Sequence, residues 1–154
     1  MEIVETVTPL QWKQLHALFE EYGISLNFAL CFQDFEAELW SLPTRYGSPA
    51  GVGLLACERK TLWGCVALRP LSHDICEMKR LYVRPACRNT GVGRQLVIRL
   101  IEEAKKRGYR AMRLETVPSS MAAAIHLYTA LGFRDIAPYH ANPVAGAWFM
   151  EISW

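Results

Sequence analysis

The stretch Leu81-Tyr82-Val83-Arg84-Pro85, closely followed by Arg88-Asn89-Thr90-Gly91-Val92-Gly93, decides the fold of this chain. Its first part ends an apolar and β-branched run from Ile75 to Val83, which predicts a strand. Its second part leads directly into a helical pattern from Gly91 to Arg107. The start of such a helix carries unpaired N–H groups and a partial positive charge. The unit therefore predicts a site for a phosphate or a similar anion.

The two glycines alone do not identify a ligand, because a tight strand-to-helix turn without any ligand explains them equally well. Other phosphate motifs fit poorly. A Walker loop needs Gly-Lys-Ser/Thr where this chain has Gly93-Arg94, and a dinucleotide fingerprint needs a third glycine where it has Leu96. Asn89 and Gly91 are residue types that tolerate the left-handed backbone such a loop often needs.

Strand and helix patterns on both sides of this unit predict α/β layering around a sheet, within one domain of residues 1–154. The elements expected before the unit are a strand at 3–7, a helix from Pro9 that Gly23 should end, a helix at 25–40, a loop at 42–49, and a hairpin with strands at 53–58 and 62–68. Those expected after it are a strand at 111–116, a helix at 121–131 capped by Pro118-Ser119-Ser120, and strands at 133–136 and 147–152.

Composition narrows the class of protein. The net charge of +2 without a long basic run argues against a nucleic-acid partner. No apolar run is long enough to cross a bilayer, and the acidic start lacks the form of a signal peptide. The five cysteines form no Cys-x-x-Cys pair, so we expect a cytoplasmic protein with free thiols. Cysteines and histidines do not cluster in the sequence, so we expect no metal.

Two segments resemble motifs of the GNAT superfamily of N-acetyltransferases. The opening stretch together with Leu96 resembles motif A, in which Gln/Arg-x-x-Gly-x-Gly/Ala follows a strand. The segment Ala124-Ile125-His126-Leu127-Tyr128-Thr129-Ala130-Leu131-Gly132-Phe133 resembles motif B, whose helix carries a tyrosine and ends in Leu-Gly-Phe. Two ordered motifs are more specific than either one alone. Asn89 departs from the family's usual glycine, although asparagine can adopt the same backbone conformation.

The resemblance implies a GNAT-like α/β (α+β) fold, with a mixed, twisted sheet of about six to seven strands and about four helices. It also implies acetyl-CoA as the acetyl donor. In the family, the strand end offers backbone groups to the pantetheine arm, and the loop amides hold the pyrophosphate. The cofactor-binding residues expected here are Leu81, Tyr82, Val83, Arg88, Asn89, Thr90, Gly91, Val92, Gly93, Arg94, Ser119 and Tyr128. Arg84 fits either a phosphate contact or an ordinary surface arginine.

Tyr128 occupies the family's tyrosine position, and a phenol there can protonate the departing thiolate. The alternative is a core tyrosine packed between Leu127 and Leu131. Ser119 and Ser120 open the same helix, where serines are more often caps than ligands.

Glu77 is the expected general base, at a strand position where the family often places it. Strand alternation predicts one shared face for Glu77, Lys79, Leu81 and Val83. The alternative is a carboxylate at the rim of the site, paired with Lys79 or Arg80. Glu115, on the next strand, is the rival base.

The acceptor is expected to be a small-molecule amine or a peptide, and the protein is expected to act without nucleic acid or membrane. Candidate acceptor-binding residues are Tyr22, Phe32, Gln33, Tyr46, His140 and Asn142. The resemblance also allows a homodimer. Two other functions stay open: a non-catalytic acyl-CoA-binding or sensing module, and a nucleotide-phosphate binder of another α/β fold.

Overall fold

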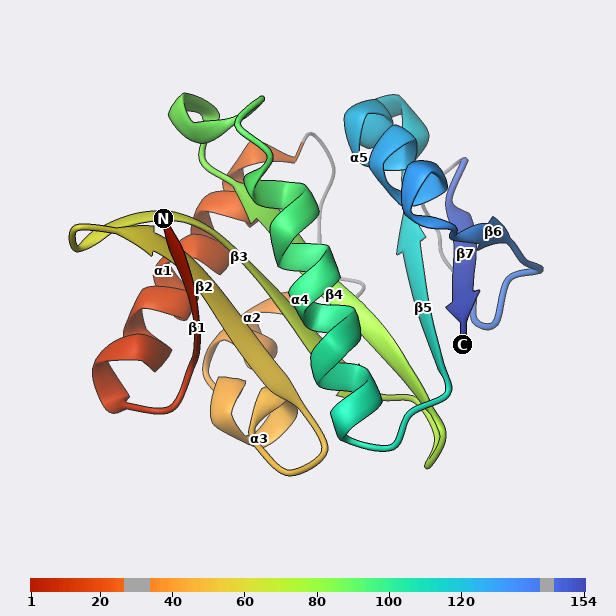
Figure 1. The fold of residues 1–154 in the computed structure, drawn as a ribbon, viewed down its shortest axis with the longest axis horizontal. Helices are drawn as coiled ribbons and strands as arrows, with labels where there is room; N and C mark the ends of the chain where they lie inside the picture. The colour runs from red at the N-terminus through yellow and green to blue at the C-terminus, as the bar shows by residue number, and fades with distance from the viewer. Residues whose placement is uncertain (27–33, 142–145) are drawn as a thin grey trace.

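The computed structural model describes residues 1–26, 34–141 and 146–154, with the backbone alone for residues 118–121. The elements in these ranges are β1 (Glu2–Glu5), α1 (Pro9–Ser25), α2 (Phe35–Leu39), α3 (Leu42–Tyr46), β2 (Val52–Glu58), β3 (Thr61–Pro70), β4 (Ile75–Val83), the short 3-10 helix η2 (Pro85–Cys87), α4 (Val92–Lys106), β5 (Ala111–Thr116), α5 (Pro118–Leu131), β6 (Arg134–Asp135) and β7 (Trp148–Ser153). The α/β class is confirmed (Figure 1).

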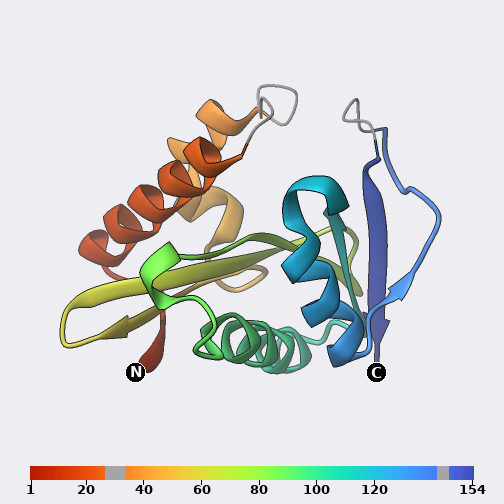
Figure 2. The same ribbon diagram turned by 90° about the horizontal axis from the view of Figure 1, so that it is seen from above.

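The strands form one sheet of seven, in the order β1-β2-β3-β4-β5-β7-β6. Only the β4–β5 pairing is parallel, so the sheet is mixed as expected. Helices α1, α2 and α3 lie on one face and α4 on the other, while β5 and β7 are turned steeply against β2 and β3 (Figure 2). None of the helices in the described ranges has the length and apolar character needed to cross a membrane.

Each face of the sheet carries its own apolar cluster. On one side, α4 packs its stripe of Leu96, Val97 and Leu100 against the sheet, and Tyr128 of α5 joins this cluster. On the other side, α1 buries Leu15 and Phe19, which belong to the second cluster. The predicted apolar spacing of α1 and α4 is confirmed, because period-3.6 stripes face the sheet in both helices.

The parallel strands β4 and β5 separate after a short pairing. Their register covers only Ile75 with Ala111, Cys76 with Met112, and Glu77 with Arg113. β4 continues to Val83 beside β3, and β5 continues to Thr116 beside β7. The sheet is therefore splayed between residues 78–83 and 114–116, where β4 and β5 no longer pair with each other (Figure 1). We call this gap between the two strands the splay.

A β-bulge in β4 overturns the predicted alternation. Arg80 has φ +61°, and the register against β3 shifts between Cys65 and Ala67. The bulge adds one residue, so side chains before and after it change phase. Leu81 and Val83 pack against the α4 cluster, whereas Arg80 turns to Glu38 on the α1–α3 face. The expected shared face of Glu77, Lys79, Leu81 and Val83 is therefore wrong.

The first helix runs past Gly23, so the expected stop there is wrong. A Cβ on Gly23 would lie 2.7 Å from Cε2 of Phe35, which explains the glycine as a point of close packing between α1 and α2. The predicted second helix is described only as α2, since its part at 27–33 lies outside the described residues.

The expected loop at 42–49 is also wrong in its first half, because α3 forms there. Pro43 lies in the first turn of α3, where its missing N–H costs nothing. Leu42 and Tyr46, four residues apart, both point into the core and hold this short helix on the sheet. The expected serine cap of α5 is wrong as well, because the helix begins at Pro118 with Val117 as N-cap.

Candidate functional site

The loop before α4 has the backbone that its composition predicted. Asn89 has φ +62° and Gly91 has φ +86°, both in the left-handed region. Gly91 is the N-cap of α4, and it makes no side-chain cap hydrogen bond. The first backbone bond of this helix runs from the N–H of Gln95 to the carbonyl of Gly91. The amides of residues 92–94 therefore have no helical acceptor and are available to an anion.

Three side chains of this loop have different roles. Arg88 donates from Nε to the carbonyl of Val83 at 2.9 Å, and its guanidinium lies 5.9 Å from the centre of the Tyr82 ring. Thr90 donates its hydroxyl to the carbonyl of Cys87. Arg94 is exposed on the first turn of α4. Arg88 thus fixes the loop to the end of β4, and its remaining N–H groups and those of Arg94 are near the helix start.

Gly93 joins the two sequence motifs in space. A Cβ at this position would lie 3.6 Å from Cγ2 of Val83 and 3.7 Å from Cδ2 of Leu127. The loop, the end of β4 and helix α5 therefore meet at one point. The partly buried side chains of Leu81 and Val83 pack against the apolar cluster on the α4 side, so the polar groups that these residues can offer a ligand are those of the backbone.

Tyr128 is buried in α5, with its ring 5.7 Å from that of Phe133. No residue in the described parts of the chain forms a hydrogen bond with its hydroxyl. Burial raises the pKa of this phenol, and nearby Tyr22 adds to the effect. The side chain is therefore a neutral donor at ordinary pH, as a proton donor to a leaving group must be.

Tyr22 approaches the splay from the C-terminal turn of α1. Its ring lies 6.3 Å from that of Tyr82, and the guanidinium of Arg80 lies 5.7 Å from its centre. Burial raises its pKa, Arg80 opposes this, and the charges of Glu38 and Glu115 add to it. Tyr46, another acceptor candidate, is instead a core residue that donates its hydroxyl to Glu38 at 3.0 Å.

Glu77 is not the rim carboxylate of the alternative reading, because it is only 1% exposed. Arg69 donates to its Oε1 from Nε at 2.9 Å, and a second nitrogen of Arg69 lies 2.9 Å away. Tyr139 donates its hydroxyl to Oε2 at 2.6 Å. Lys79 is a looser partner at 3.9 Å, and Arg80 pairs with Glu38 instead.

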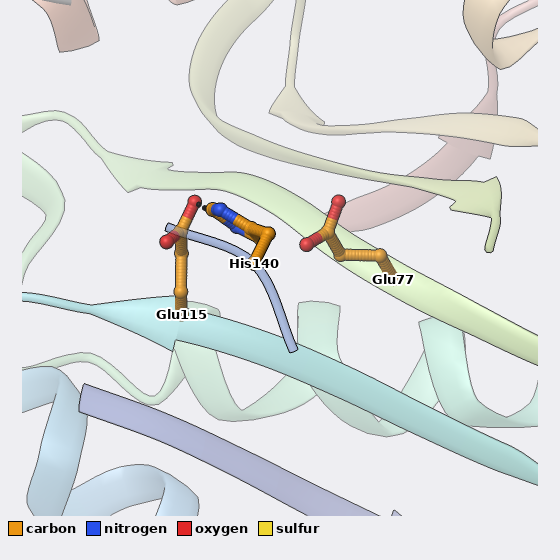
Figure 3. Close-up of side chains that lie close together, drawn as sticks. All are labelled: Glu77, Glu115 and His140. Carbon is orange, nitrogen blue, oxygen red and sulfur yellow. Dashed lines mark ion pairs between the residues drawn. The ribbon is translucent and has the colours of Figure 1, made fainter. Parts of the chain in front are cut away.

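The fold brings three separate acid–base groups together beside the splay. Oxygen and nitrogen atoms of Glu77 on β4, Glu115 on β5 and His140 after β6 all lie within 4.8 Å of one another (Figure 3). Nε2 of His140 lies 3.1 Å from Oε1 of Glu115, and its ring packs edge-on against Tyr139 and Phe149. Glu115, the rival base, and His140, a candidate acceptor-binding residue, therefore lie close to Glu77.

The same three residues have ligand atoms that a metal ion uses. The contacts of Glu77 with three residues argue against a metal ion there. Arg69 and Tyr139 already bind both oxygens of Glu77, and the ammonium of Lys79 adds positive charge 3.9 Å from it. The absence of a metal stays a prediction.

Other expected site residues serve the fold or are not described. Arg84 binds Glu21 through two hydrogen bonds of 3.0 and 2.7 Å, and so ties the end of β4 to α1. The side chain of Ser119 lies outside the described side chains. Phe32, Gln33 and Asn142 lie outside the described residues.

Sequence reasoning missed the two groups that hold Glu77. Arg69 is on β3, eight residues before Glu77, and Tyr139 is 62 residues after it. For Arg69 a signal exists, because a hairpin of β3 and β4 places it opposite Glu77. For Tyr139 no local pattern predicts the contact.

Comparisons with known proteins identify the family and the fold of the chain. The Acetyltransferase (GNAT) family profile matches residues 12–133. An uncharacterized N-acetyltransferase of Schizosaccharomyces pombe is 38% identical over 137 residues, which cover 88% of this chain and 83% of that protein. A GNAT acetyltransferase from Staphylococcus aureus superposes with a TM-score of 0.79 at 19% identity, over 99% and 98% of the two chains.

A second solved structure shows the fold with its cofactor. A GNAT acetyltransferase from Elizabethkingia anophelis, solved with acetyl-CoA bound, matches 68% of this chain and 77% of its own, with a TM-score of 0.58 and 24% identity. The family match covers most of this chain, from residue 12 to residue 133. The matched part includes the splayed pair of β4 and β5, the glycine loop and the tyrosine of α5. The chain belongs to the GNAT family of acetyltransferases.

Proposed function

We propose that the protein transfers the acetyl group of acetyl-CoA to a primary amine, by direct attack within a ternary complex. The observation that carries the proposal is the splay, with the unpaired amides of α4 at one end and Tyr128 and Glu77 beside it. Family membership supports the class of reaction. Acetyl-CoA is a long thioester that carries phosphates. The edge of β4 that does not pair with β5 could bind its arm, and the anion site near the end of β4 could bind its pyrophosphate.

On the donor side, the amides of residues 89–94 would hold the pyrophosphate, and the backbone of residues 81–83 would pair with the pantetheine arm. The side chains of Arg88 and Arg94 can add charge-assisted hydrogen bonds. Ser119 completes the proposed cofactor set. We define the donor side as residues 81–94 together with Tyr128.

The chemistry needs one base, one acid and one oxyanion donor. The amine lone pair attacks the thioester carbon, so a C–N bond forms while the C–S bond breaks. The amine loses a proton to the base, and the thiolate takes one from Tyr128. Backbone N–H groups at residues 81–83 would stabilise the oxyanion. The products are an N-acetyl amine and coenzyme A.

Glu77 is the proposed base, and Glu115 is the alternative. Both carboxylates lie beside the splay, on the two strands that border it. We define the acceptor side as Glu77, Lys79, Glu115, Tyr139 and His140. A larger fall in turnover for Glu77→Gln than for Glu115→Gln would support the assignment, and the reverse order would transfer the role to Glu115.

The cellular location and the oligomeric state are also matters of proposal. We propose a cytoplasmic location, in keeping with the free thiols of the four cysteines in the described ranges. A homodimer stays a prediction. Neither nucleic acid nor a membrane is part of the proposed activity.

Two measurements test the function together. Acetyl-CoA should raise the melting temperature, whereas ATP and NAD should not, because only a ligand of the native state stabilises it. Free thiol should then appear when acetyl-CoA and a suitable amine are both present. Stabilisation by ATP or NAD but not acetyl-CoA would favour a nucleotide binder. Cofactor binding without turnover over a broad amine panel would favour a non-catalytic module.

A further inference from the structure

Lys79 is a buried cation on the acceptor side. Its side chain is 11% exposed, and it enters the α1–α3 face just before the bulge at Arg80. Within the described residues its ammonium has no hydrogen-bond partner. Its one ion-pair contact there is Oε1 of Glu77 at 3.9 Å, and Arg69 already binds that oxygen at 2.9 Å.

The neighbouring arginines differ from Lys79 because their charges are matched. Arg80 binds Glu38 with two hydrogen bonds of 3.0 and 2.9 Å, and both side chains are almost fully buried. Arg113 binds Glu151 at 2.7 Å. Of these three cations, Lys79 is thus the one that lacks a close partner in the described ranges.

A buried ammonium without close hydrogen bonds is costly, and a bound anion would offset that cost. Burial lowers the pKa of Lys79, Arg80 acts in the same direction, and the charges of Glu77, Glu38 and Glu115 oppose them. Those carboxylates are held by other groups, so a carboxylate brought by a ligand would be the first to bind Lys79 closely.

The acceptor side therefore offers both signs of charge within a few ångströms. Glu77 and Glu115 carry negative charge beside the splay, and Lys79 can receive a carboxylate. We propose that Lys79 binds the carboxylate of the acceptor, and that the acceptor is a free α-amino acid. This inference rests on the proposed N-acetyltransferase activity.

The charge arrangement separates this class from other amines. In an α-amino acid a single carbon joins the ammonium to the carboxylate, so the two charges lie close together. Lys79 and Glu77 carry opposite charges that are also close together, 3.9 Å apart. A polyamine would place further positive charge against Lys79. A protein N-terminus has a peptide carbonyl in place of the α-carboxylate, and so would leave the ammonium of Lys79 without an anionic partner.

The test compares each common L-amino acid with its own amide, using thiol release from acetyl-CoA. The two differ only in the carboxylate, so the ratio of their kcat/KM values isolates its recognition. The proteins are the wild type, Lys79→Met, Lys79→Arg and Lys13→Met, the last a control at an exposed lysine of α1. Melting temperatures and acetyl-CoA affinity are measured for all four.

The wild type should prefer at least one amino acid over its amide. Lys79→Met should reduce that preference roughly 10- to 100-fold, mainly through KM, as expected for loss of one charge-assisted hydrogen bond. Lys79→Arg should retain part of the preference, and Lys13→Met all of it. Lys79→Met should also melt no lower than the wild type, because it removes a buried charge.

Two results would overturn the inference alone: a wild type that uses amides as well as amino acids, or a Lys79→Met variant that keeps the full preference. The comparison of amino acids with their amides uses only the wild type, so it tests the inference even if Lys79→Met folds poorly. A third result, acetyl-CoA binding without thiol release for any amine, would overturn the proposed function and this inference with it.

Discussion

The donor side and the acceptor side flank the same splay, but they are built from different material. The donor side uses backbone: left-handed residues at Asn89 and Gly91, free amides at the start of α4, and an unpaired edge of β4. The acceptor side uses polar and charged side chains from β4, β5 and the segment after β6. Backbone groups suit the acetyl donor, which is the same for every acceptor. Side chains can be substituted in evolution, so they can adapt the other side to a particular acceptor.

The difference also concerns how each side is held in place. On the acceptor face, the Arg80–Glu38 pair is buried and holds the bulge that orients Lys79 and Arg80. At the donor end of β4, the Arg84–Glu21 pair is about one-third exposed. The acceptor side should therefore depend strongly on one ion pair, and the donor side should not.

The largest expected effect follows from that contrast. Glu38→Ala should lower the free energy of unfolding by about 3–5 kcal/mol, because it leaves a buried guanidinium without its partner. The matched control is Glu21→Ala, which should cost about 1 kcal/mol or less. Urea denaturation measures both. Equal losses for the two variants would mean that burial does not distinguish these pairs.

Tyr128→Phe addresses the point where the two sides meet. Removing the phenol should lower kcat about 100-fold or more, as for loss of a general acid, and leave acetyl-CoA affinity nearly unchanged. Tyr109→Phe is the control, since its hydroxyl donates to the carbonyl of Ala50 away from the splay. Unchanged turnover in Tyr128→Phe would remove this residue from the mechanism.

Gly91→Asp tests the donor side alone. A carboxylate beside the free amides would compete with the pyrophosphate, so acetyl-CoA affinity should fall roughly 10- to 100-fold, or about 1.4–2.8 kcal/mol. Gly108→Asp is a matched control, because Gly108 has φ +87° against +86° for Gly91 and equally open surroundings. Calorimetry that finds the same loss for both variants would attribute the effect to backbone strain.

The smallest expected effect concerns the pH dependence of kcat, which should show no loss of activity from ionisation of Tyr128. Burial raises the pKa of Tyr128 above its ordinary value near ~10, so the phenol stays protonated as the pH rises toward that value. The profile of kcat should show no descending limb between pH 7 and about 9.5. A descending limb in this window that vanishes in Tyr128→Phe would show that the phenol ionises earlier than its burial implies.

The backbone conformation of the loop before α4 could be predicted from the sequence because its determinants are local. Asn89, Gly91 and Gly93 lie within five residues, directly between a strand and a helix, and each position restricts the backbone in a known way. The elements β2 to β5 and helix α4 were also predicted within a few residues of their ends, because their apolar periods are clear.

The acceptor side could not be predicted in the same way. Tyr139 and Glu77 are 62 residues apart, and Arg80 and Glu38 are 42 apart, so no local pattern records either contact. The bulge at Arg80 shifted the strand alternation without a glycine or proline to signal it. Gly23 misled for a related reason, since its role depends on Phe35 of another helix.

A crystal structure with coenzyme A would show whether the splay and the loop at 88–94 bind acetyl-CoA. We expect pyrophosphate oxygens within about 3 Å of the amides of residues 89–94, the pantetheine arm between β4 and β5, and the sulfur beside the hydroxyl of Tyr128. A cofactor whose pyrophosphate lies away from the start of α4, or whose arm lies outside the splay, would contradict this expectation.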